Sequence, residues 1–528
     1  MPVTVLRDYI ELPQAIKARL REGACVVLAA FLAACAVLPE APVPVPEAAS
    51  KPGPLGAIAE IGREIQPEQS SFHLLPAAED AMHWRLALID SAVSSIDIQY
   101  FIWKDDASGS LMLEHVFAAA DRGVKVRMMI DDMFLSTSGA FEGADETLAA
   151  ISYHPNIAVR LFNPGKYRSG ITGLAGNFGG SLKAYNRRMH NKMIIFDGLL
   201  GLVGGRNIGD EYFGLHEPYN FLDLDLLAAG TVVSEASEAF VEYWNSDLAY
   251  PATALMDMDR AGHLAIRKLN ADYVKVQSLR LARFDPDLRG EDYYLKILRT
   301  EMHFGFAVFL QDEPVLRGGR EYRLADMLSE IVEPGSREVV VSSPYLIPVG
   351  NILDIVREDV EAGVEVRLLT NSLASNDEVP AHSHYKKYRQ DILATGARLY
   401  EFHHQPAGDL RKYSDVTVPE GNIVALHTKA YSVDGERCYV GSLNIDPRSI
   451  ELNTENGIYI ESKELCGELS ELLNSFTQPE NAWSVTLDDT GKLRWQSYEG
   501  TTSSQPALGL GQRISDFFFR ILPIESQL

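Results

Sequence analysis

Two distant stretches of the chain carry the same polar residues in the same order and at the same spacing. Four residues separate a lysine from an aspartate, and six more separate that aspartate from a glycine turn. The stretches are His190-Asn191-Lys192, Asp197 and Gly204-Gly205-Arg206-Asn207, and then His427-Thr428-Lys429, Asp434 and Gly441-Ser442-Leu443-Asn444. So many matches at fixed offsets are not expected by chance from average residue usage. The fold must therefore accommodate two copies of one unit.

A second internal match extends the repeat beyond these motifs. The segments Asp121–Ile130 (DRGVKVRMMI) and Glu361–Thr370 (EAGVEVRLLT) match in residue type and order. In each, a glycine is followed by the alternating residue pattern of a strand. Helix-like stretches precede them at 111–120 and 352–360, after strand-like stretches at 96–102 and 339–342. Strand–helix–strand order with short turns is typical of an α/β sheet. The sequence therefore predicts a duplicated α/β fold with a pseudo-twofold axis.

The histidine and lysine of each motif are expected to share one face of a strand. Residues two apart on a strand point the same way. Because Met189–Phe196 has the pattern of a strand, His190 and Lys192 face the same side. The second copy repeats this arrangement with His427 and Lys429.

The glycine turns add two amides to this face. Asn207 and Asn444 follow the turns, which bring their side chains back beside the strands. A twofold axis would then gather two imidazoles, two ammonium groups and two amides around one pocket. Cations and amide donors stabilise the extra charge on pentacoordinate phosphorus, and one imidazole can attack while the other protonates the leaving alcohol. The pattern therefore predicts phosphodiester chemistry that requires neither a metal nor a cofactor.

The paired motifs resemble the two HxKx₄D motifs of the phospholipase D superfamily, and the resemblance covers most of Ser71–Leu472. Within that superfamily the chain is similar to the bacterial cardiolipin synthases. The similarity lies in Ser343-Pro344-Tyr345, Leu369-Thr370-Asn371-Ser372-Leu373 and His384-Tyr385. The resemblance implies a duplicated α/β/α sandwich with its active site between the halves.

The resemblance also implies a covalent phosphatidyl-histidine intermediate. His190 would be the nucleophile and His427 the general acid, later the base, although the near-symmetric motifs allow the roles to be exchanged. The implied enzyme makes cardiolipin from phosphatidylglycerol and a phospholipid donor, for which phosphatidylethanolamine is a candidate. Its partners would be these lipids and a membrane surface. The first alternative is a phospholipase D-type hydrolase, in which the same chemistry transfers the phosphatidyl group to water.

Acidic residues accompany both motifs. The resemblance implies that an acidic residue downstream of each motif orients the histidine by accepting from its second ring nitrogen. In the second half Glu455 fits this role, and in the first half Asp223 is favoured over Asp225. The motif residues Asp197 and Asp434 each precede a glycine at a strand end, where hydrogen bonds that brace the turn are expected.

One position departs from the pattern. Gly205 stands where the second copy has Ser442, and the missing hydroxyl is expected to weaken one phosphate contact.

The N-terminus has the features of an export signal. Basic residues precede an apolar run from Ala24 to Leu38, which is too short to span a bilayer comfortably. Inside it, Leu32-Ala33-Ala34-Cys35 resembles a bacterial lipobox, in which the cysteine receives a lipid. An ordinary signal peptide or a buried helix is the alternative. We expect a signal peptide over 1–38 and a Pro-rich tether over 39–54, so that the protein is exported and anchored to a bacterial cell membrane through Cys35.

The remaining boundaries follow from the repeat. We expect a first domain over 55–234, a mostly helical connecting segment between the halves over 235–330, a second domain over 331–472, and a C-terminal extension over 473–528. The tail 508–528 either caps the second domain or lies on a bilayer with its three consecutive phenylalanines.

The net charge of −25 disfavours nucleic acid as a partner, because an acidic surface repels phosphate polyanions. A phosphodiesterase acting on nucleic acid is therefore a weaker alternative, as is a catalytically silent lipid-binding protein. A basic cluster, either a headgroup site or a solvated loop, comprises Lys166, Arg168, Lys183, Arg187 and Arg188.

Several single residues have less specific interpretations. Cys438 and Cys466 are expected to be isolated buried thiols, with a disulfide as the alternative. His403 and His404 are expected at the surface. The resemblance places His382 and His384 at the pocket or its rim, and Tyr100 and Tyr345 belong either to the pocket entrance or to the core.

Overall fold

The computed structural model describes residues 55–56, 69–132, 144–165, 186–255, 259–314, 323–332, 334–414 and 423–528. The predicted signal peptide with Cys35 and the whole of the predicted tether lie outside these residues, as do Lys166, Arg168 and Lys183 of the basic cluster.

Eight of the nine described strands of the first half form one continuous run, and the ninth, β7 (Tyr219–Leu222), pairs with a strand of the second half instead. Three strands pair in parallel in the order β2–β3–β4, and β9 adds antiparallel to β4. On the other side of β2, the antiparallel strands follow in the order β5, β6, β8 and β1. The strands are β1 Ser70–Leu75, β2 Ser95–Tyr100, β3 Lys125–Asp131, β4 Ile157–Phe162, β5 Met193–Phe196, β6 Leu200–Gly204, β7 Tyr219–Leu222, β8 Asp225–Ala229 and β9 Ala249–Pro251.

The second half repeats this order strand for strand. Parallel β11–β12–β13 is extended by antiparallel β18 on one side and by β15, β16, β17 and β10 on the other. A hairpin of β19 and β20 adds beyond β18. The strands are β10 His303–Gln311, β11 Glu338–Ser342, β12 Glu365–Asn371, β13 Arg398–Phe402, β14 Ile423–Leu426, β15 Ala430–Val433, β16 Arg437–Gly441, β17 Asn456–Glu461, β18 Ala482–Leu487, β19 Leu493–Ser497 and β20 Gly500–Thr502.

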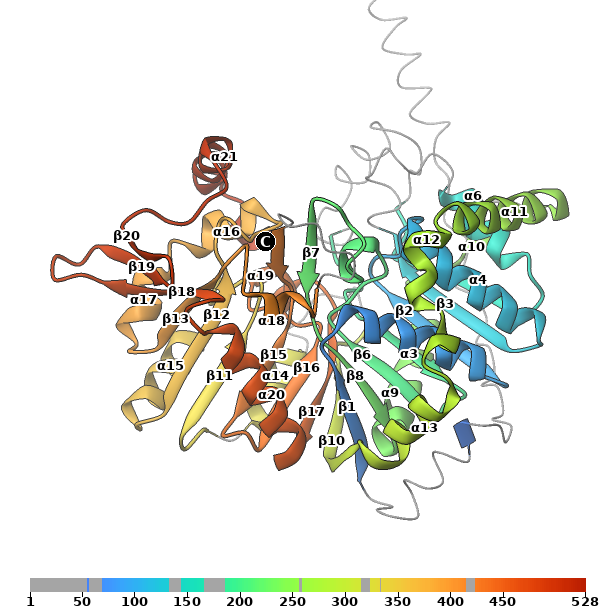
Figure 1. Ribbon diagram of the computed structural model, residues 1–528, viewed down its shortest axis with the longest axis horizontal. Coiled ribbons are helices and arrows are strands. Elements are labelled where there is room, and N and C mark those ends of the chain that lie inside the picture. The colour runs from blue at the N-terminus through green and yellow to red at the C-terminus, as the bar shows by residue number, and fades with distance from the viewer. Residues whose placement is uncertain are drawn as a thin grey trace, which may run out of the picture.

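The two halves join edge to edge at their first strands. β1 pairs antiparallel with β10, with Ser71 opposite Phe304, which makes one 18-stranded sheet. Equivalent strands lie on either side of this junction, and Figure 1 shows the first half in blue and green beside the second in yellow and red. The predicted duplicated α/β fold with a pseudo-twofold axis is confirmed.

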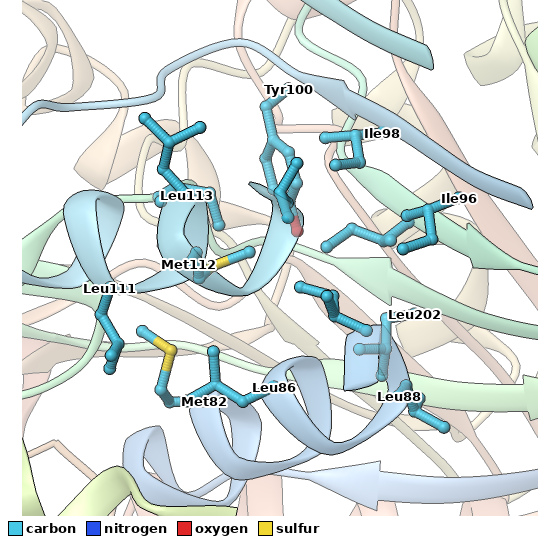
Figure 2. Close-up of a cluster of buried hydrophobic side chains, with 14 of the residues drawn as sticks. Met82, Leu86, Leu88, Ile96, Ile98, Tyr100, Leu111, Met112, Leu113 and Leu202 are labelled. Carbon is cyan, nitrogen blue, oxygen red and sulfur yellow. The ribbon is translucent and has the colours of Figure 1, made fainter. Parts of the chain in front are cut away.

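Helices cover both faces of the sheet. In the first half α3 and α4 pack on one face of β2 and β3, and Figure 2 shows their side chains meeting Ile96, Ile98 and Tyr100. On the opposite face α9 and its counterpart α20 share one apolar core that includes residues of both halves. The principal helices are α3 Ala78–Ser91, α4 Ala107–Asp121, α6 Ala144–Ser152, α9 Thr231–Trp244, α10 Ala252–Leu255, α11 Arg260–Val276, α12 Ser278–Leu281, α13 Glu291–Thr300, α14 Leu324–Ile331, α15 Ile352–Glu361, α16 Val379–Tyr385, α17 Arg389–Ala394, α18 Gly408–Arg411, α19 Pro447–Glu451, α20 Lys463–Phe476 and α21 Leu510–Arg520.

The prediction that residues 235–330 pack between the halves holds for β10 but not for the helices of the segment. The segment is rich in helix, but α11 packs on α4 and α6 at the outside of the first half. Leu281, Phe284 and Ile297 add to the core there. The same segment also contains β10, whose apolar residues pair with the strands at the junction. This strand was not predicted from the sequence, because the segments on either side of it have helical periodicity.

The two cysteines of the second half form a disulfide, so the expectation of isolated thiols was wrong. Cys438 lies on β16 and Cys466 on α20, with Cα atoms 5.5 Å apart. The helix packs directly over this part of the sheet, where Ser432 Oγ of β15 donates to the Cys466 carbonyl. That packing brings together two residues that lie 28 positions apart in the chain.

Candidate active site

Two pairs of extended segments cross between the halves and position both motifs. β7 of the first half pairs in parallel with β14 of the second. At the end of this pair the His427 amide donates to the Leu222 carbonyl at 2.8 Å. In the symmetric pair the His190 amide donates to the Thr454 carbonyl, also at 2.8 Å. His427 is therefore held beside the residue after Leu222, and His190 beside the residue after Thr454.

The residues after Leu222 and Thr454 are Asp223 and Glu455, the two carboxylates predicted to orient the histidines. Nδ1 of His190 lies 2.7 Å from Oε2 of Glu455, and Nδ1 of His427 lies 2.5 Å from Oδ2 of Asp223. The pairing crosses between the halves, so the carboxylate downstream of one motif bonds the histidine of the other. Because Nδ1 is engaged in each ring, Nε2 is the nitrogen left to meet a substrate.

The rejected candidate Asp225 has a different environment. Its carboxylate accepts from Arg85 at 2.9 Å and from Arg206 at 3.2 Å, and all three residues are buried. Arg206 also donates to the Asp223 carbonyl at 2.7 Å, so this cluster supports the short connection between β7 and β8 that carries Asp223. The Asp225 carboxylate itself is bonded to arginines rather than to a histidine.

The two lysines occupy equivalent positions. Lys192 Nζ donates to the carbonyl of His190 at 2.6 Å, and Lys429 Nζ donates to that of His427 at 2.5 Å. Burial lowers the pKa of Lys192 to about 7 and that of Lys429 to about 8. Burial and the neighbouring lysines also hold the pKa of both histidines well below its usual value. The site therefore favours neutral imidazoles and gains from an incoming anion.

The two carboxylates have raised pKa values for the same reason. Burial raises the pKa of Glu455 to about 7, and burial raises the pKa of Asp223. Their further contacts differ. Ser442 Oγ donates to Glu455 Oε2 at 2.6 Å, whereas a Cβ on Gly205 would lie 2.2 Å from Asp223 Oδ1.

This difference corrects the interpretation of Gly205 as a lost phosphate contact. The Ser442 hydroxyl is bonded to the carboxylate that pairs with His190. Asp223 occupies the space that a side chain at Gly205 would need. The carboxylate beside His190 is therefore a glutamate bonded to Ser442, and the carboxylate beside His427 is an aspartate packed against Gly205.

The two motif amides are buried near the histidines and have protein partners. Asn207 Nδ2 donates to Tyr212 Oη at 2.8 Å, and its Oδ1 accepts from the Ile102 amide at 3.2 Å. Asn444 Nδ2 reaches Ser449 Oγ at 3.4 Å. An amide nitrogen carries two hydrogens, so each retains one N–H beyond these contacts. Their role as phosphate donors stays a prediction.

The motif aspartates lie at the opposite end of the motif strand from the histidines. Asp197 follows β5, whereas His190 precedes it. Its carboxylate accepts from the amides of Ser94 at 2.7 Å and Ser95 at 2.9 Å. Asp434 likewise accepts from the Arg337 and Glu338 amides at 2.7 and 3.0 Å. Both residues have positive φ, 54° and 57°, and both tie a turn to the start of a neighbouring strand.

Sequence reasoning missed the aromatic rings around the histidines. Phe101 meets the His190 ring edge-on with centroids 5.0 Å apart, and Lys192 Nζ lies 5.6 Å from its centroid. Phe221 and Tyr212 contact the His427 ring at 4.7 and 5.3 Å. Phe101 follows β2 directly and Phe221 precedes Asp223 by two positions, but only the fold shows that they line the site.

Tyr100 and Tyr345, each expected either at the pocket entrance or in the core, differ in their positions. Tyr100 belongs to the core, with its hydroxyl beside Arg85. Tyr345 Oη donates to Asp377 at 3.0 Å. Asp377 is close enough to the site for Lys429 to lower its pKa, although burial raises that pKa overall. Tyr345 therefore lies near the site.

Three other histidines, His382, His384 and His403, are buried, whereas His404 is half-buried. His382 and His384 are buried against the C-terminal segment, where His382 pairs with Asp516 at 3.3 Å and His384 with Glu525 at 2.9 Å. His403 is fully buried and stacks on Trp483 with centroids 5.4 Å apart, so its expected surface position was wrong.

The two basic-cluster residues that the structure describes are buried rather than part of a solvated loop. Arg188 is fully buried and contacts Asp131 at 3.4 Å and the Asn163 carbonyl at 3.1 Å. Its neighbour Arg187 is buried as well. Arg188 therefore supports the segment before His190, and its contacts are with the protein rather than with a lipid headgroup site.

No group of three or more histidine, cysteine or acidic side chains is arranged to hold a metal ion within the described ranges. Among the helices that the structure describes, none combines the length and apolar character needed to cross a bilayer.

Comparisons with known proteins agree with this architecture. The family model described as "Cardiolipin synthase, PLD-like domain" matches residues 86–244 and 328–477. Cardiolipin synthase C of Escherichia coli (strain K12) is 34% identical over 478 residues, covering 87% of this chain and 96% of that protein. Major cardiolipin synthase ClsA of Bacillus subtilis (strain 168) is 23% identical over 399 residues, covering 74% of this chain and 66% of that protein.

A solved structure shows the same fold. The crystal structure of phosphatidylserine synthase from Haemophilus influenzae Rd KW20 matches with a TM-score of 0.50 at 14% identity, covering 80% of this chain and 91% of that one. The family model matches more than half of this chain, in two segments that correspond to its two halves. The chain therefore belongs to the phospholipase D superfamily, as a member of the cardiolipin synthase family.

Proposed function

We propose that this protein is a phosphatidyl transferase that makes cardiolipin from phosphatidylglycerol and a phospholipid donor through a phosphohistidine intermediate. The single observation that carries the proposal is the pair of crossed histidine–carboxylate contacts, His190 with Glu455 and His427 with Asp223. The resemblance of the chain to cardiolipin synthases supports the choice of substrates.

The first step transfers the phosphatidyl group to the enzyme. Nε2 of His190 forms a bond to the donor phosphorus, and the bond from phosphorus to the headgroup oxygen breaks. His427 gives the proton on its Nε2 to that oxygen, and Asp223 stabilises the imidazolium beforehand. The phosphate anion of the substrate offsets Lys192 and Lys429, so that binding favours the protonated form of His427 that the empty site disfavours.

The second step passes the group to an acceptor lipid. A glycerol hydroxyl of phosphatidylglycerol gives its proton to His427, its oxygen bonds to phosphorus, and the bond to His190 Nε2 breaks. Cardiolipin leaves, and both histidines return to their starting states. In both steps Lys192 and Lys429 stabilise the charge on the phosphorus oxygens, and the free N–H groups of Asn207 and Asn444 add to it.

The surroundings of the histidines favour transfer over hydrolysis. His190 and His427 are 7% and 5% exposed, and the rings of Phe101, Tyr212 and Phe221 flank them. A site so poor in water gives a lipid hydroxyl the advantage over water in the second step.

We further propose that the protein is exported and tethered to a bacterial membrane through Cys35. The disulfide between Cys438 and Cys466 supports export, because such bonds persist in oxidising compartments. The test is mass spectrometry of a Cys35-containing peptide from membranes, where a diacylglycerol thioether is expected. An unmodified Cys35 in the mature protein would overturn the tether.

The transferase is tested with full-length protein reconstituted into phosphatidylglycerol vesicles, with and without phosphatidylethanolamine and EDTA. Lipid products are measured by mass spectrometry. We expect cardiolipin that persists in EDTA, with release of glycerol or ethanolamine identifying the donor. His190→Ala and His427→Ala are each expected to abolish it.

The matched control is His115→Ala, which alters a half-buried histidine paired with Asp90 outside the site and should leave turnover unchanged. Phosphatidic acid as the only product would favour the hydrolase. Cardiolipin formed at the wild-type rate by His190→Ala would overturn the proposal.

A further inference from the structure

The C-terminal helix α21 presents an apolar face to the outside of the molecule. Its large apolar residues recur at intervals of three and four, which places them on one side of the helix. That side is exposed rather than packed. The fractional exposures are 74% for Leu510, 60% for Ile514, 65% for Phe517, 55% for Phe518 and 66% for Ile521.

The polar side of α21 is the side that packs on the protein. Asp516 is 2% exposed and contacts His382 at 3.3 Å, Gln505 at 3.0 Å and Lys386. An ordinary surface helix buries its apolar stripe and exposes its polar one. In α21 the charged contacts fix the helix in the reverse orientation, and its apolar stripe has no partner among the described residues.

The same segment is tied to the region of the active site. Gln512 Nε2 donates to the carbonyl of Leu373, in the loop after β12 that also contains Asp377. The chain end reaches the first half, because Gln527 Oε1 accepts from Asn186 at 2.5 Å, four residues before His190. Figure 1 shows α21 standing out above α16, on the same side as the C-terminus.

We propose that the exposed face of α21 inserts into the surface of a phospholipid bilayer and holds the active site against it. This inference deepens the proposed function and rests on it, because a transferase with two phospholipid substrates must work at a bilayer. The chain carries a net charge of −25, so an anionic bilayer repels it as a whole. The lipid proposed on Cys35 would keep the chain near the bilayer, and apolar insertion of α21 would hold the active site against its surface.

The size of the face favours a bilayer over a second copy of the chain. Five aliphatic and aromatic side chains, more than half exposed, offer roughly 500 Å² of apolar surface. A stable protein interface buries about 800 Å² on each partner. The face is too small for such a dimer, whereas a short helix with leucine, isoleucine and phenylalanine on one side is typical of an interfacial segment.

Depth in the bilayer is tested without reference to activity. Full-length protein carrying Phe518→Trp is reconstituted into vesicles with brominated acyl chains, which quench nearby tryptophan. Four of the five native tryptophans are buried and supply a constant background. Leu279→Trp is the matched control, because Leu279 is 95% exposed on α12 at the outside of the first half. We expect quenching of the tryptophan at position 518 and none at position 279. Equal quenching at the two positions, or none at 518, would overturn the proposal.

The consequence for activity is tested with two forms of substrate. Phe517→Ser/Phe518→Ser should lose roughly tenfold or more in turnover of phosphatidylglycerol vesicles and keep turnover of monomeric short-chain phosphatidylglycerol. Leu269→Ser/Leu279→Ser, which changes two exposed residues elsewhere, should keep both.

The outcomes separate the two proposals. No turnover of either substrate by the wild-type protein contradicts the transferase, while the quenching result still decides the role of α21. An equal loss on both substrates, or a dimer in light scattering that Phe517→Ser/Phe518→Ser dissociates, contradicts bilayer insertion.

Discussion

Oε2 of Glu455 lies 2.7 Å from Nδ1 of His190, although the two residues belong to opposite halves of the chain. The reciprocal contact joins His427 to Asp223 at 2.5 Å. Both follow from segments that pair across the halves just before each histidine. Each half therefore holds a histidine and the carboxylate that serves the other half's histidine.

Glu455→Gln should lower kcat by roughly 10²-fold or more, because glutamine keeps the shape of the contact but loses the charge that orients and stabilises the imidazole. Cardiolipin formation under saturating substrate measures this. Glu461→Gln is the matched control, since Glu461 is exposed on the following strand. Unchanged kcat in Glu455→Gln would remove Glu455 from the mechanism.

The same variant should change how stability depends on pH. Burial raises the pKa of Glu455 from 4.5 to about 7, so between these values the folded state holds a proton that the unfolded state loses. The contribution of Glu455 to stability therefore falls as pH rises through this window. Relative to wild type, Glu455→Gln should gain up to about 3 kcal/mol between pH 4.5 and 7. Urea unfolding at several pH values measures it, and a constant difference between the two proteins would contradict the raised pKa.

Gly205→Ala should displace Asp223, because the new Cβ would lie 2.2 Å from Oδ1 of that carboxylate. Turnover should fall by roughly 10²-fold as His427 loses its orienting partner. The matched change in the other half is Ser442→Ala, which adds no bulk and removes one hydrogen bond to Glu455. It should reduce turnover by about tenfold or less. If the two variants behaved alike, the crowding at Gly205 would not be the cause.

Asp197→Asn should reduce stability rather than catalysis. Asn tolerates the positive φ of this position, and its Oδ1 can still accept from the Ser94 and Ser95 amides, but an amide nitrogen in place of Oδ2 cannot accept from the Val93 amide, which lies 3.1 Å away. A loss of about 1–3 kcal/mol in the free energy of unfolding is expected, with turnover per folded molecule unchanged. Asp90→Asn, at an exposed aspartate, is the control. A fall in turnover as large as that of His190→Ala would make Asp197 catalytic.

Reduction of the disulfide should destabilise the second half. A bond that closes the 28-residue span between Cys438 and Cys466 contributes about 3.6 kcal/mol in the chain-entropy model. Adding dithiothreitol should lower the Tm of the wild-type protein and leave that of Cys438→Ala/Cys466→Ala unchanged. A Tm that dithiothreitol does not alter in the wild type would contradict a stabilising bond.

The sequence predicted what is local or repeated. The spacing of His190, Lys192 and Asp197 and its recurrence near His427 gave the duplicated fold, because strand periodicity and turn residues act over a few positions. The matching segments Asp121–Ile130 and Glu361–Thr370 likewise became equivalent strands, β3 and β12.

The rest depends on contacts between distant parts of the chain. Nothing in the order of residues states that Glu455 would serve His190, since that follows from how the halves pair. Phe101 and Phe221 join the site for the same reason. His382 was misplaced because its partner Asp516 lies in a tail that folds back over the second half. The strand β10 was hidden among helices whose periodicity dominates that stretch.

The most direct test of the account is to find which histidine carries the phosphatidyl group. Full-length wild-type protein and His427→Ala are mixed with phosphatidylglycerol, quenched at alkaline pH to preserve phosphohistidine, digested and analysed by mass spectrometry. The account predicts a phosphatidyl group on the peptide that contains His190 and none on the peptide that contains His427. A modified His427, or cardiolipin formation by His190→Ala, would contradict it.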